Sequence, residues 1–365
     1  MFKEGDLRKH RFGVNYTPSR RWYYCWNDFE SDAIARDFDA IAALGMDHLR
    51  LMLIWPSFHP NPDWVSPVHL ERLDKVMRLA GERNLDVQPA VFTGWLSGYA
   101  FKPPFLPREP FYTSEKMWKA QELFVRELVK VLSPHKNFLG FDLGNEINCC
   151  WSADTKDGDA WMDRMLSLME SLCPERLHIN GVDNGPWFEK GTFSPQAVAA
   201  RNRIIPLHAY IFFTGALKHS GPLEPPCVNL AAGMAALSRS WGGVPDKPVW
   251  VQEFGASDEW VPRKDIPEFM EKTVEAAVNE GVSWFTWWAS HDIDRSMAFH
   301  SLEYDLGLLT VKNEPKESAR MFKALAERYG GKPVRIPSRR LPPPPEKLEH
   351  EMVWRWLLDW MGWKK

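Results

Sequence analysis

The sequence predicts an α/β fold, and two observations carry this prediction. Short, continuously apolar runs of strand length alternate with amphipathic runs of helical length from residue 11 to residue 329. Continuously apolar strands that alternate with helices are typical of a parallel sheet whose outer face those helices cover. The alternation gives eight strand–helix units, which is the number in a (β/α)8 barrel, or TIM barrel, with enlarged loops.

Each unit of this barrel has its own boundaries in the sequence. The expected strands cover residues 11–16, 47–55, 85–92, 138–144, 176–181, 203–210, 248–254 and 282–288. The expected helices cover residues 30–45, 67–83, 114–133, 157–172, 194–201, 228–241, 265–280 and 314–329. The first helix closes at Gly45, a residue type common just past helix ends. An open, doubly wound sheet is the alternative, but no G-x-G-x-x-G motif follows the first strand, so we favour the barrel.

The last 35 residues depart from the strand–helix pattern. We therefore expect a barrel domain at residues 1–330 and a C-terminal extension at 331–365, which holds a proline run and a tryptophan-rich amphipathic segment. An apolar stripe of this kind usually packs on the parent domain, and we expect it to do so here. A contact with a second copy of the chain, giving a homo-oligomer, is the alternative. The stripe consists of Met352, Trp356, Leu357 and Trp360.

Composition and charge narrow the class of protein. The chain is 44% apolar and 25% charged, as in soluble globular proteins, and its formal net charge is −3. Acidic and basic residues are interspersed, so neither a nucleic-acid partner nor a membrane partner is expected. The N-terminus is charged and lacks an apolar core, so we expect a cytoplasmic protein. The five cysteines are scattered without a C-x-x-C pair, so we predict no metal site and no cofactor.

The stretch "FDLGNEIN" (141–148) ends an apolar run in an amide and a carboxylate, Asn145 and Glu146. A barrel places its functional groups at the carboxyl ends of its strands, and these residues end the fourth expected strand. Glu253 ends the seventh, across the mouth from the fourth. Other candidates at strand ends are Asn15, Tyr16, Arg50, Trp55, Thr93, Trp95, His208, Tyr210, Trp287 and Trp288.

A pair of carboxyl groups suits the cleavage of a glycosidic bond. One group donates a proton to the leaving oxygen, and the other attacks the sugar, with retention if the two lie about 5–5.5 Å apart. Glu253 must then stay ionised, which a nearby Arg50 and a hydroxyl donated by Tyr210 favour. Glu146 must start protonated, and burial together with a neighbouring negative charge raises its pKa. Either glutamate alone could instead start a loop or form an ion pair.

The order of these motifs resembles glycoside hydrolase clan A, and family 5 most closely, over residues 11–329. The matching residues are Arg50, Asn145-Glu146, His208-Ala209-Tyr210, Glu253 and the segment "SWFTWW" with Trp287 at the platform position. The resemblance implies that Glu146 is the acid/base and Glu253 the nucleophile. It also implies that Asn145 holds the sugar 2-hydroxyl, that Arg50 and Tyr210 orient Glu253, and that His208 hydrogen-bonds near the acid/base or the substrate.

The resemblance also bears on the substrate. The third strand runs into "AVFTGWLSG" and lacks the histidine pair of family 5 cellulases, whereas "GVNYTPSRRWYYCWNDF" and "LGMDHLRLMLIWPSFHPNP" resemble the β-mannosidase-type subgroup. A small oligosaccharide with a terminal β-mannoside is therefore the expected substrate. Indole rings stack on sugar faces, and the candidate subsite walls are Trp22, Trp26, Trp95, Trp151, Trp187, Trp260 and Trp288.

Three other functions remain as alternatives. An endo-β-mannanase or another endo-β-glycanase would use the same residues and would differ in its dependence on chain length. A carbohydrate-binding protein on an inactive barrel is disfavoured because both carboxyl groups are present. A barrel aldolase or isomerase is disfavoured because we find no lysine at a strand end and no phosphate-binding glycine loop.

Overall fold

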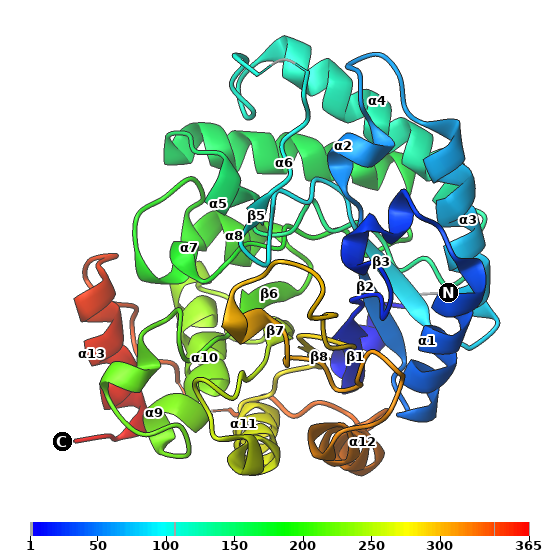
Figure 1. Cartoon of the computed structure of the whole chain (residues 1–365). Coiled ribbons are helices and arrows are strands. Elements are labelled where there is room, and N and C mark those ends of the chain that lie inside the picture. The colour runs from blue at the N-terminus through cyan, green and yellow to red at the C-terminus, as the bar shows by residue number, and fades with distance from the viewer. Residues whose placement is uncertain (1–2, 106, 339, 365) are drawn as a thin grey trace.

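Parallel strands form the centre of the molecule, and helices surround them (Figure 1). The computed structural model describes residues 3–105, 107–338 and 340–364. Strands that are hydrogen-bonded neighbours follow the order β3-β2-β1-β8-β7-β6. They are Arg11–Asn15 (β1), His48–Met52 (β2), Asp86–Ala90 (β3), Ile205–His208 (β6), Val249–Phe254 (β7) and Trp284–Trp287 (β8).

Two short segments continue this sheet where the fourth and fifth strands are expected. Parallel bridges join β3 to Phe138 and Asp142, and Asp142 in turn pairs with Ile179. The two segments approach closely because Gly140 has a φ of +142°, and a Cβ on it would lie 2.0 Å from the carbonyl oxygen of Leu177. With these segments the strand order is that of a (β/α)8 barrel, which confirms the predicted fold.

The helices of the outer layer begin and end within a few residues of their predicted limits. Several begin at a serine whose hydroxyl accepts a hydrogen bond from a backbone N–H of the first turn, as Ser114 does from Met117 at 3.3 Å. The outer helices are Ser31–Ala43 (α1), Pro67–Gly81 (α3), Glu115–Leu132 (α4), Thr155–Leu172 (α6), Pro195–Arg201 (α8), Leu230–Gly242 (α10), Ile266–Asn279 (α11) and Glu317–Tyr329 (α12).

Short elements interrupt the connections between strands and helices. A hairpin, Trp95–Leu96 (β4) with Tyr99–Ala100 (β5), stands in the loop after β3, where the sequence predicts only a loop. The short α-helices are Trp55–Phe58 (α2), Ile147–Cys150 (α5), Gly185–Phe188 (α7) and Pro225–Val228 (α9). The 3-10 helices are Glu4–Arg8 (η1), Trp22–Trp26 (η2), Ala216–Lys218 (η3), Arg263–Asp265 (η4) and Ser301–Glu303 (η5).

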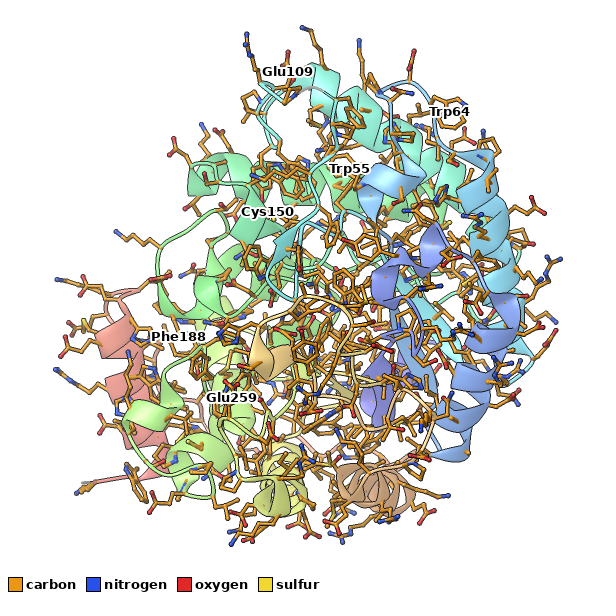
Figure 2. All side chains as sticks on the ribbon, viewed as in Figure 1. Trp55, Trp64, Glu109, Cys150, Phe188 and Glu259 are labelled. Carbon is orange, nitrogen blue, oxygen red and sulfur yellow. The ribbon has the colours of Figure 1, made fainter. Side chains whose placement is uncertain are left out.

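Side chains fill the centre of the ring, so the barrel is a packed core and not a channel (Figure 2). A separate apolar cluster lies inside the barrel and includes Leu7 of η1 together with Trp250 of β7 and Trp284 of β8. Leu7 precedes the first strand, so this cluster marks the N-terminal end of the barrel. The polar side chains at the opposite, carboxyl ends of the strands therefore form the mouth.

The C-terminal helix His350–Met361 (α13) lies outside the helical ring, against α7, α9 and α10 (Figure 1). Its buried side chains are Val353, Trp354 and Leu357, so the buried face is turned slightly from the predicted stripe, in which only Leu357 is fully buried. The indole N–H of Trp354 donates to the carbonyl oxygen of Thr214 at 2.7 Å. The predicted outer limits at residues 1 and 365 fall outside the described residues. None of the described helices combines the length and the apolar character that crossing a membrane requires.

Candidate active site

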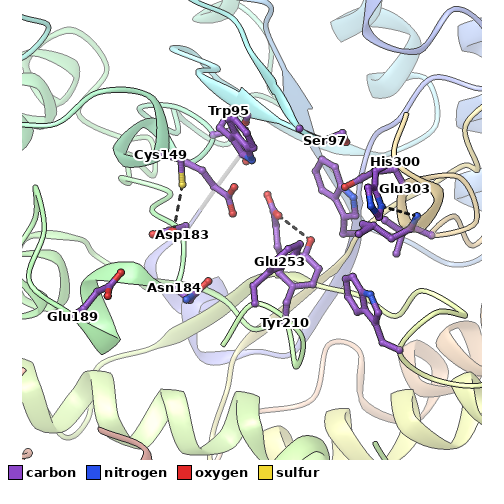
Figure 3. A pocket seen from close by; sticks show the side chains of 18 residues that line it. Trp95, Ser97, Cys149, Asp183, Asn184, Glu189, Tyr210, Glu253, His300 and Glu303 are labelled. Atoms are coloured by element: carbon purple, nitrogen blue, oxygen red, sulfur yellow. Dashed lines mark hydrogen bonds between the residues drawn. The ribbon is translucent and has the colours of Figure 1, made fainter. Parts of the chain in front are cut away.

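A cavity of about 740 Å³ opens at the mouth of the barrel (Figure 3). It lies at the carboxyl ends of the strands, as expected for a site on this fold. The side chains that line it come from loops far apart in the sequence. Among the residues singled out from the sequence, those that line the cavity are Trp95, Asn145, Glu146, Tyr210, Glu253, Trp260 and Trp288.

Glu253 reaches the cavity from the end of β7, where the strand is irregular. The register between β7 and β8 shifts between Val251 and Phe254. Successive residues of a regular strand face opposite sides, and a β-bulge changes this alternation locally. Because of the shift, both Gln252 and Glu253 make hydrogen bonds with residues inside the barrel.

The Glu253 carboxylate is held by a cation and a hydroxyl. Arg50 of β2 donates to its Oε1 at 2.5 Å, and the Tyr210 hydroxyl donates to its Oε2 at 2.9 Å. Arg50 is itself fully buried and also bonds to Asp142 at 2.8 Å and to Asn15 at 3.2 Å. One buried guanidinium thus serves two carboxylates, which fixes the position of Glu253 and favours its ionised form.

Glu146 stands at the start of α5 in a left-handed backbone conformation, with φ of +47°. Such a conformation is costly for a residue with a Cβ and is found mostly where function requires it. The backbone N–H of Glu146 donates to the carbonyl oxygen of Gly181 at 3.1 Å. Its Oε1 lies 2.7 Å from Nδ1 of His208, and its side chain keeps 16% exposure to the cavity.

The tautomer of His208 follows from the hydrogen bonds around it. The Gln252 amide donates to Oδ2 of Asp142 at 2.9 Å, so its Oε1 faces His208 as an acceptor, 3.2 Å from Nε2. The proton of His208 therefore sits on Nε2 when the ring is neutral, and burial lowers the pKa of His208. Nδ1 is then an acceptor, and the protonated carboxyl group of Glu146 is the donor that fits it.

Burial raises the pKa of Glu146 to about 8, with a further contribution from the carboxylate of Asp183 and a partial offset from Arg50. Burial also raises the pKa of Glu253, while His208, Arg50 and the Tyr210 hydroxyl oppose that rise. The negative neighbour of Glu146 was expected in the sequence, but its source after the fifth strand was not. At neutral pH the raised pKa favours a protonated Glu146, while Arg50 and the Tyr210 hydroxyl donate to the carboxylate form of Glu253.

The two glutamates and His208 lie close together. One carboxylate oxygen from each glutamate and a ring nitrogen of His208 all lie within 4.8 Å of one another. Three such groups could also hold a metal ion, but the hydrogen bond between His208 and Glu146 already accounts for part of this arrangement. This closest approach of the two carboxyl groups is shorter than the 6.5–9.5 Å separation of glycosidases that place a water between the two groups.

Two predicted site residues lie elsewhere than expected. Trp287 does not line the cavity, because it faces the outer layer, 6.2 Å from Phe322 of α12, and Trp288 lines the cavity instead. Successive strand residues face opposite sides, and this accounts for the exchange. Trp22 is buried behind the cavity wall, with its ring 4.8 Å from that of Phe299.

Of the other predicted site residues, some line the cavity and some are packed away from it. Asn145 donates to the carbonyl oxygen of Trp95 at 2.7 Å, and its buried Oδ1 has no partner among the described residues, so this oxygen is available to a ligand in the cavity. Trp26, Trp151 and Trp187 belong to packed clusters and do not line the cavity.

Comparison with solved structures places the chain among known enzymes. It matches a glutamate-to-alanine variant of GH5_18 from Streptomyces cattleya in complex with Manβ1-4GlcNAc, with 34% identity and a TM-score of 0.84. The match covers 90% of this chain and 83% of that one. The protein belongs to glycoside hydrolase family 5. It is therefore a glycosidase, as the order of motifs at the strand ends predicts.

Other neighbours of this family 5 glycosidase agree. A GH5_18 variant from Bifidobacterium longum subsp. longum, also in complex with Manβ1-4GlcNAc, has 32% identity and a TM-score of 0.84 over 89% of this chain and 80% of that one. An exo-β-1,4-mannosidase from an Opitutaceae bacterium has 24% identity and a TM-score of 0.80 over 90% of this chain and 62% of that one, which shows the fold alone. No family model and no curated protein sequence matches the chain.

Several residues in the site of this family 5 glycosidase escaped the sequence analysis. Asp183 follows the fifth strand, for which no strand-end residue was considered, so a signal was present there. Gln252 adjoins Glu253 but would face the other side of a regular strand. Ser97 and Glu303, which also line the cavity, lie in the turn between β4 and β5 and in η5, and neither ends a strand of the barrel.

Proposed function

We propose that the protein is a retaining β-mannosidase that releases terminal mannose from short oligosaccharides by double displacement. One observation carries this proposal: in one cavity Glu146, whose pKa is raised to about 8, lies within 4.8 Å of Glu253, whose carboxylate accepts hydrogen bonds from Arg50 and Tyr210. A carboxylic acid beside a stabilised carboxylate at this separation suits retention of configuration.

In the first step, Glu146 gives its proton to the glycosidic oxygen while a carboxylate oxygen of Glu253 attacks C1 of the sugar. The bond from C1 to the glycosidic oxygen breaks, the alcohol departs, and an α-linked glycosyl ester of Glu253 remains. Arg50 and Tyr210 hold Glu253 in line for this attack. The free Oδ1 of Asn145 is suited to accept a hydrogen bond from the sugar 2-hydroxyl.

In the second step, Glu146 is ionised and takes a proton from a water molecule. The resulting nucleophile attacks C1, the ester bond to Glu253 breaks, and the sugar leaves with its original β configuration. Neutral His208 helps Glu146 in the first step, because Nδ1 accepts a hydrogen bond from the protonated carboxyl group and so favours the form that gives its proton to the glycosidic oxygen. Nε2–H remains bonded to Gln252 throughout.

Mannose is the proposed sugar because the Streptomyces cattleya and Bifidobacterium longum neighbours, at 34% and 32% identity, hold Manβ1-4GlcNAc. The sequence features at the third strand lead to the same sugar. A disaccharide of this kind is thus the proposed natural type of substrate. The cytoplasmic location stays a prediction.

Azide separates the roles of the two carboxyl groups. Glu253→Gly should lose turnover, and azide with an activated aryl β-mannoside should give the α-mannosyl azide. Glu146→Ala should accumulate the glycosyl-enzyme, and azide should release it as the β-mannosyl azide. Glu259→Ala removes an exposed carboxylate of the neighbouring loop and is the matched control. Near-normal rates in both active-site variants would refute the assignment.

A panel of aryl β-glycosides tests the sugar. The manno compound should be cleaved with the highest kcat/KM, ahead of the gluco, galacto and xylo compounds. Manβ1-4GlcNAc and mannobiose should be cleaved readily, and longer chains should bring little gain. A steep rise in kcat/KM with chain length would instead favour an endo-β-mannanase.

A further inference from the structure

One side of the cavity is closed by loops that are fastened to each other. The Tyr99 hydroxyl of the β4–β5 hairpin donates to the carbonyl oxygen of Ala298, in the loop after β8. The rings of Tyr99 and Phe299 lie 5.2 Å apart, and Trp22 packs against both, at 5.8 Å and 4.8 Å. Segments after β1, β3 and β8 thus form a joined aromatic wall behind the cavity.

Two polar groups on the inner side of this wall interact with each other. The Oγ of Ser97 and Oε2 of Glu303 are shielded from solvent, and neither makes a close hydrogen bond to any other group in the described part of the chain. Both residues line the same cavity as Glu146 and Glu253. Ser97 also has a left-handed φ of +48°. Buried polar atoms with few hydrogen bonds are costly, and hydroxyl groups of a bound ligand would supply the missing ones.

The mechanism decides which part of the substrate meets this wall. Glu146 protonates the leaving oxygen, so the departing group lies on the Glu146 side of the cavity, where Cys149, Asp183 and Glu189 lie (Figure 3). The transferred sugar lies over Glu253. Its end farthest from C1 therefore points to the opposite side, where Figure 3 shows Ser97 and Glu303.

We propose that Glu303, assisted by Ser97, binds the hydroxyl groups at the non-reducing end of the glycone. This inference rests on the proposed function. We expect the aromatic wall behind these two residues to exclude a further sugar at that end. The pair thereby selects a terminal, unsubstituted sugar and makes the enzyme exo-acting. Burial raises the pKa of Glu303 to about 7, in keeping with a carboxyl group enclosed at the end of a cavity.

Substrate analogues and variants together test this proposal. Aryl β-mannosides that lack one hydroxyl group at a time are compared in the wild type, Glu303→Gln, Glu303→Ala and Ser97→Ala, with Glu259→Ala as the exposed control. Glu303→Ala should lower kcat/KM for the full mannoside about 10- to 100-fold, because hydrogen bonds to a charged group are lost. The decisive readout is coupling: one deoxy analogue should be poor for the wild type yet no worse than the full mannoside for Glu303→Ala.

If every deoxy analogue loses the same factor in the wild type and in both Glu303 variants, Glu303 does not bind the glycone, and the inference is overturned. The same holds if the wild type releases the aryl group from an aryl β-mannobioside as fast as from the mannoside. Circular dichroism and the conservative Glu303→Gln variant guard against a folding defect. If the wild type prefers another aryl β-glycoside, the proposed sugar is wrong, and the coupling test is made with that glycoside.

Discussion

Two carboxylate–histidine pairs lie at opposite ends of the barrel, and only one of these two is suited to catalysis. At the N-terminal end of β2, Nδ1 of His48 lies 2.6 Å from Oδ1 of Asp47. At the mouth, Nδ1 of His208 lies 2.7 Å from Oε1 of Glu146. Both histidines are fully buried. The hydrogen bond between carboxyl group and imidazole is thus nearly the same in the two pairs.

What differs is the position of the nearest cation. Burial raises the pKa of Asp47, but Arg11, bonded to it at 3.1 Å, together with His48 and a backbone hydrogen bond at Phe12, outweighs burial and holds that pKa below its usual range. Arg50 at the mouth bonds to Glu253, and burial with the charge of Asp183 raises the pKa of Glu146 to about 8. An arginine bonded directly to Asp47 thus favours the ionised form of that carboxyl group. Glu146 has no such direct bond among the described residues and can therefore act as a proton donor.

The largest expected effect comes from exchanging each arginine for methionine. Arg50→Met should lower kcat about 100- to 1,000-fold, because the nucleophile loses the donor that orients and ionises it. Arg11→Met should leave kcat within about threefold and lower the free energy of unfolding by about 1–3 kcal/mol, since Asp47 and Asp86 lose a partner. Steady-state kinetics and denaturant unfolding of both variants make the test.

One outcome would contradict the conclusion that only the mouth of the barrel is catalytic. If Arg11→Met reduces kcat as strongly as Arg50→Met while remaining folded, the two ends of the barrel are not functionally distinct. Glu253 could then not be singled out by its arginine.

The fold was predictable because its signal is spread over many residues. Six of the expected strands form within three residues of their predicted limits, and helix α4 begins after Ser114 and ends at Leu132, within one residue of its prediction. The fourth and fifth strands are irregular because Gly140 lets two backbones approach closely, a contact between distant segments that no local pattern reveals. The hairpin β4–β5 was not predicted because each of its strands is only two residues long, too short for a recognisable pattern.

The site was predictable where residues end regular strands and obscure elsewhere. Glu253 contacts Arg50 and Tyr210, and Glu146 contacts His208, as their positions suggested. Strand alternation was misjudged at Trp287, and the bulge in β7 could not be foreseen, so Gln252 was missed. Glu303 lies 16 residues beyond the end of β8, and only the folded loop brings it to the cavity.

A smaller effect should follow from Gln252→Met, which keeps the side-chain volume but removes the acceptor for Nε2 of His208. The imidazole is then free to carry its proton on Nδ1, where it donates to the Glu146 carboxylate and stabilises the ionised form. We expect a loss of kcat of about tenfold, and an alkaline limb of kcat/KM displaced to lower pH. An unchanged pH profile would mean that Gln252 has only a packing role.

Asp183→Asn should give the smallest effect and the sharpest reading of the proton donor. Glu146 acts in its protonated form, so kcat/KM is present below its pKa of about 8 and is lost as pH rises through that value. The neutral amide removes a repelling charge and lowers that pKa, so the alkaline limb should move below pH 8.

The amide oxygen can still accept the bonds that Asn148 and the Gly185 N–H now make with Oδ1, so the loop should keep its shape. Asp47→Asn also removes one negative charge, but at the far end of the barrel, and should leave the limb in place. Measuring kcat/KM at pH 6 and pH 8 suffices for this test. The value at pH 8 divided by the value at pH 6 should fall severalfold in Asp183→Asn and stay unchanged in Asp47→Asn. If both variants move the limb equally, net charge and not the placement of Asp183 sets the pKa of Glu146.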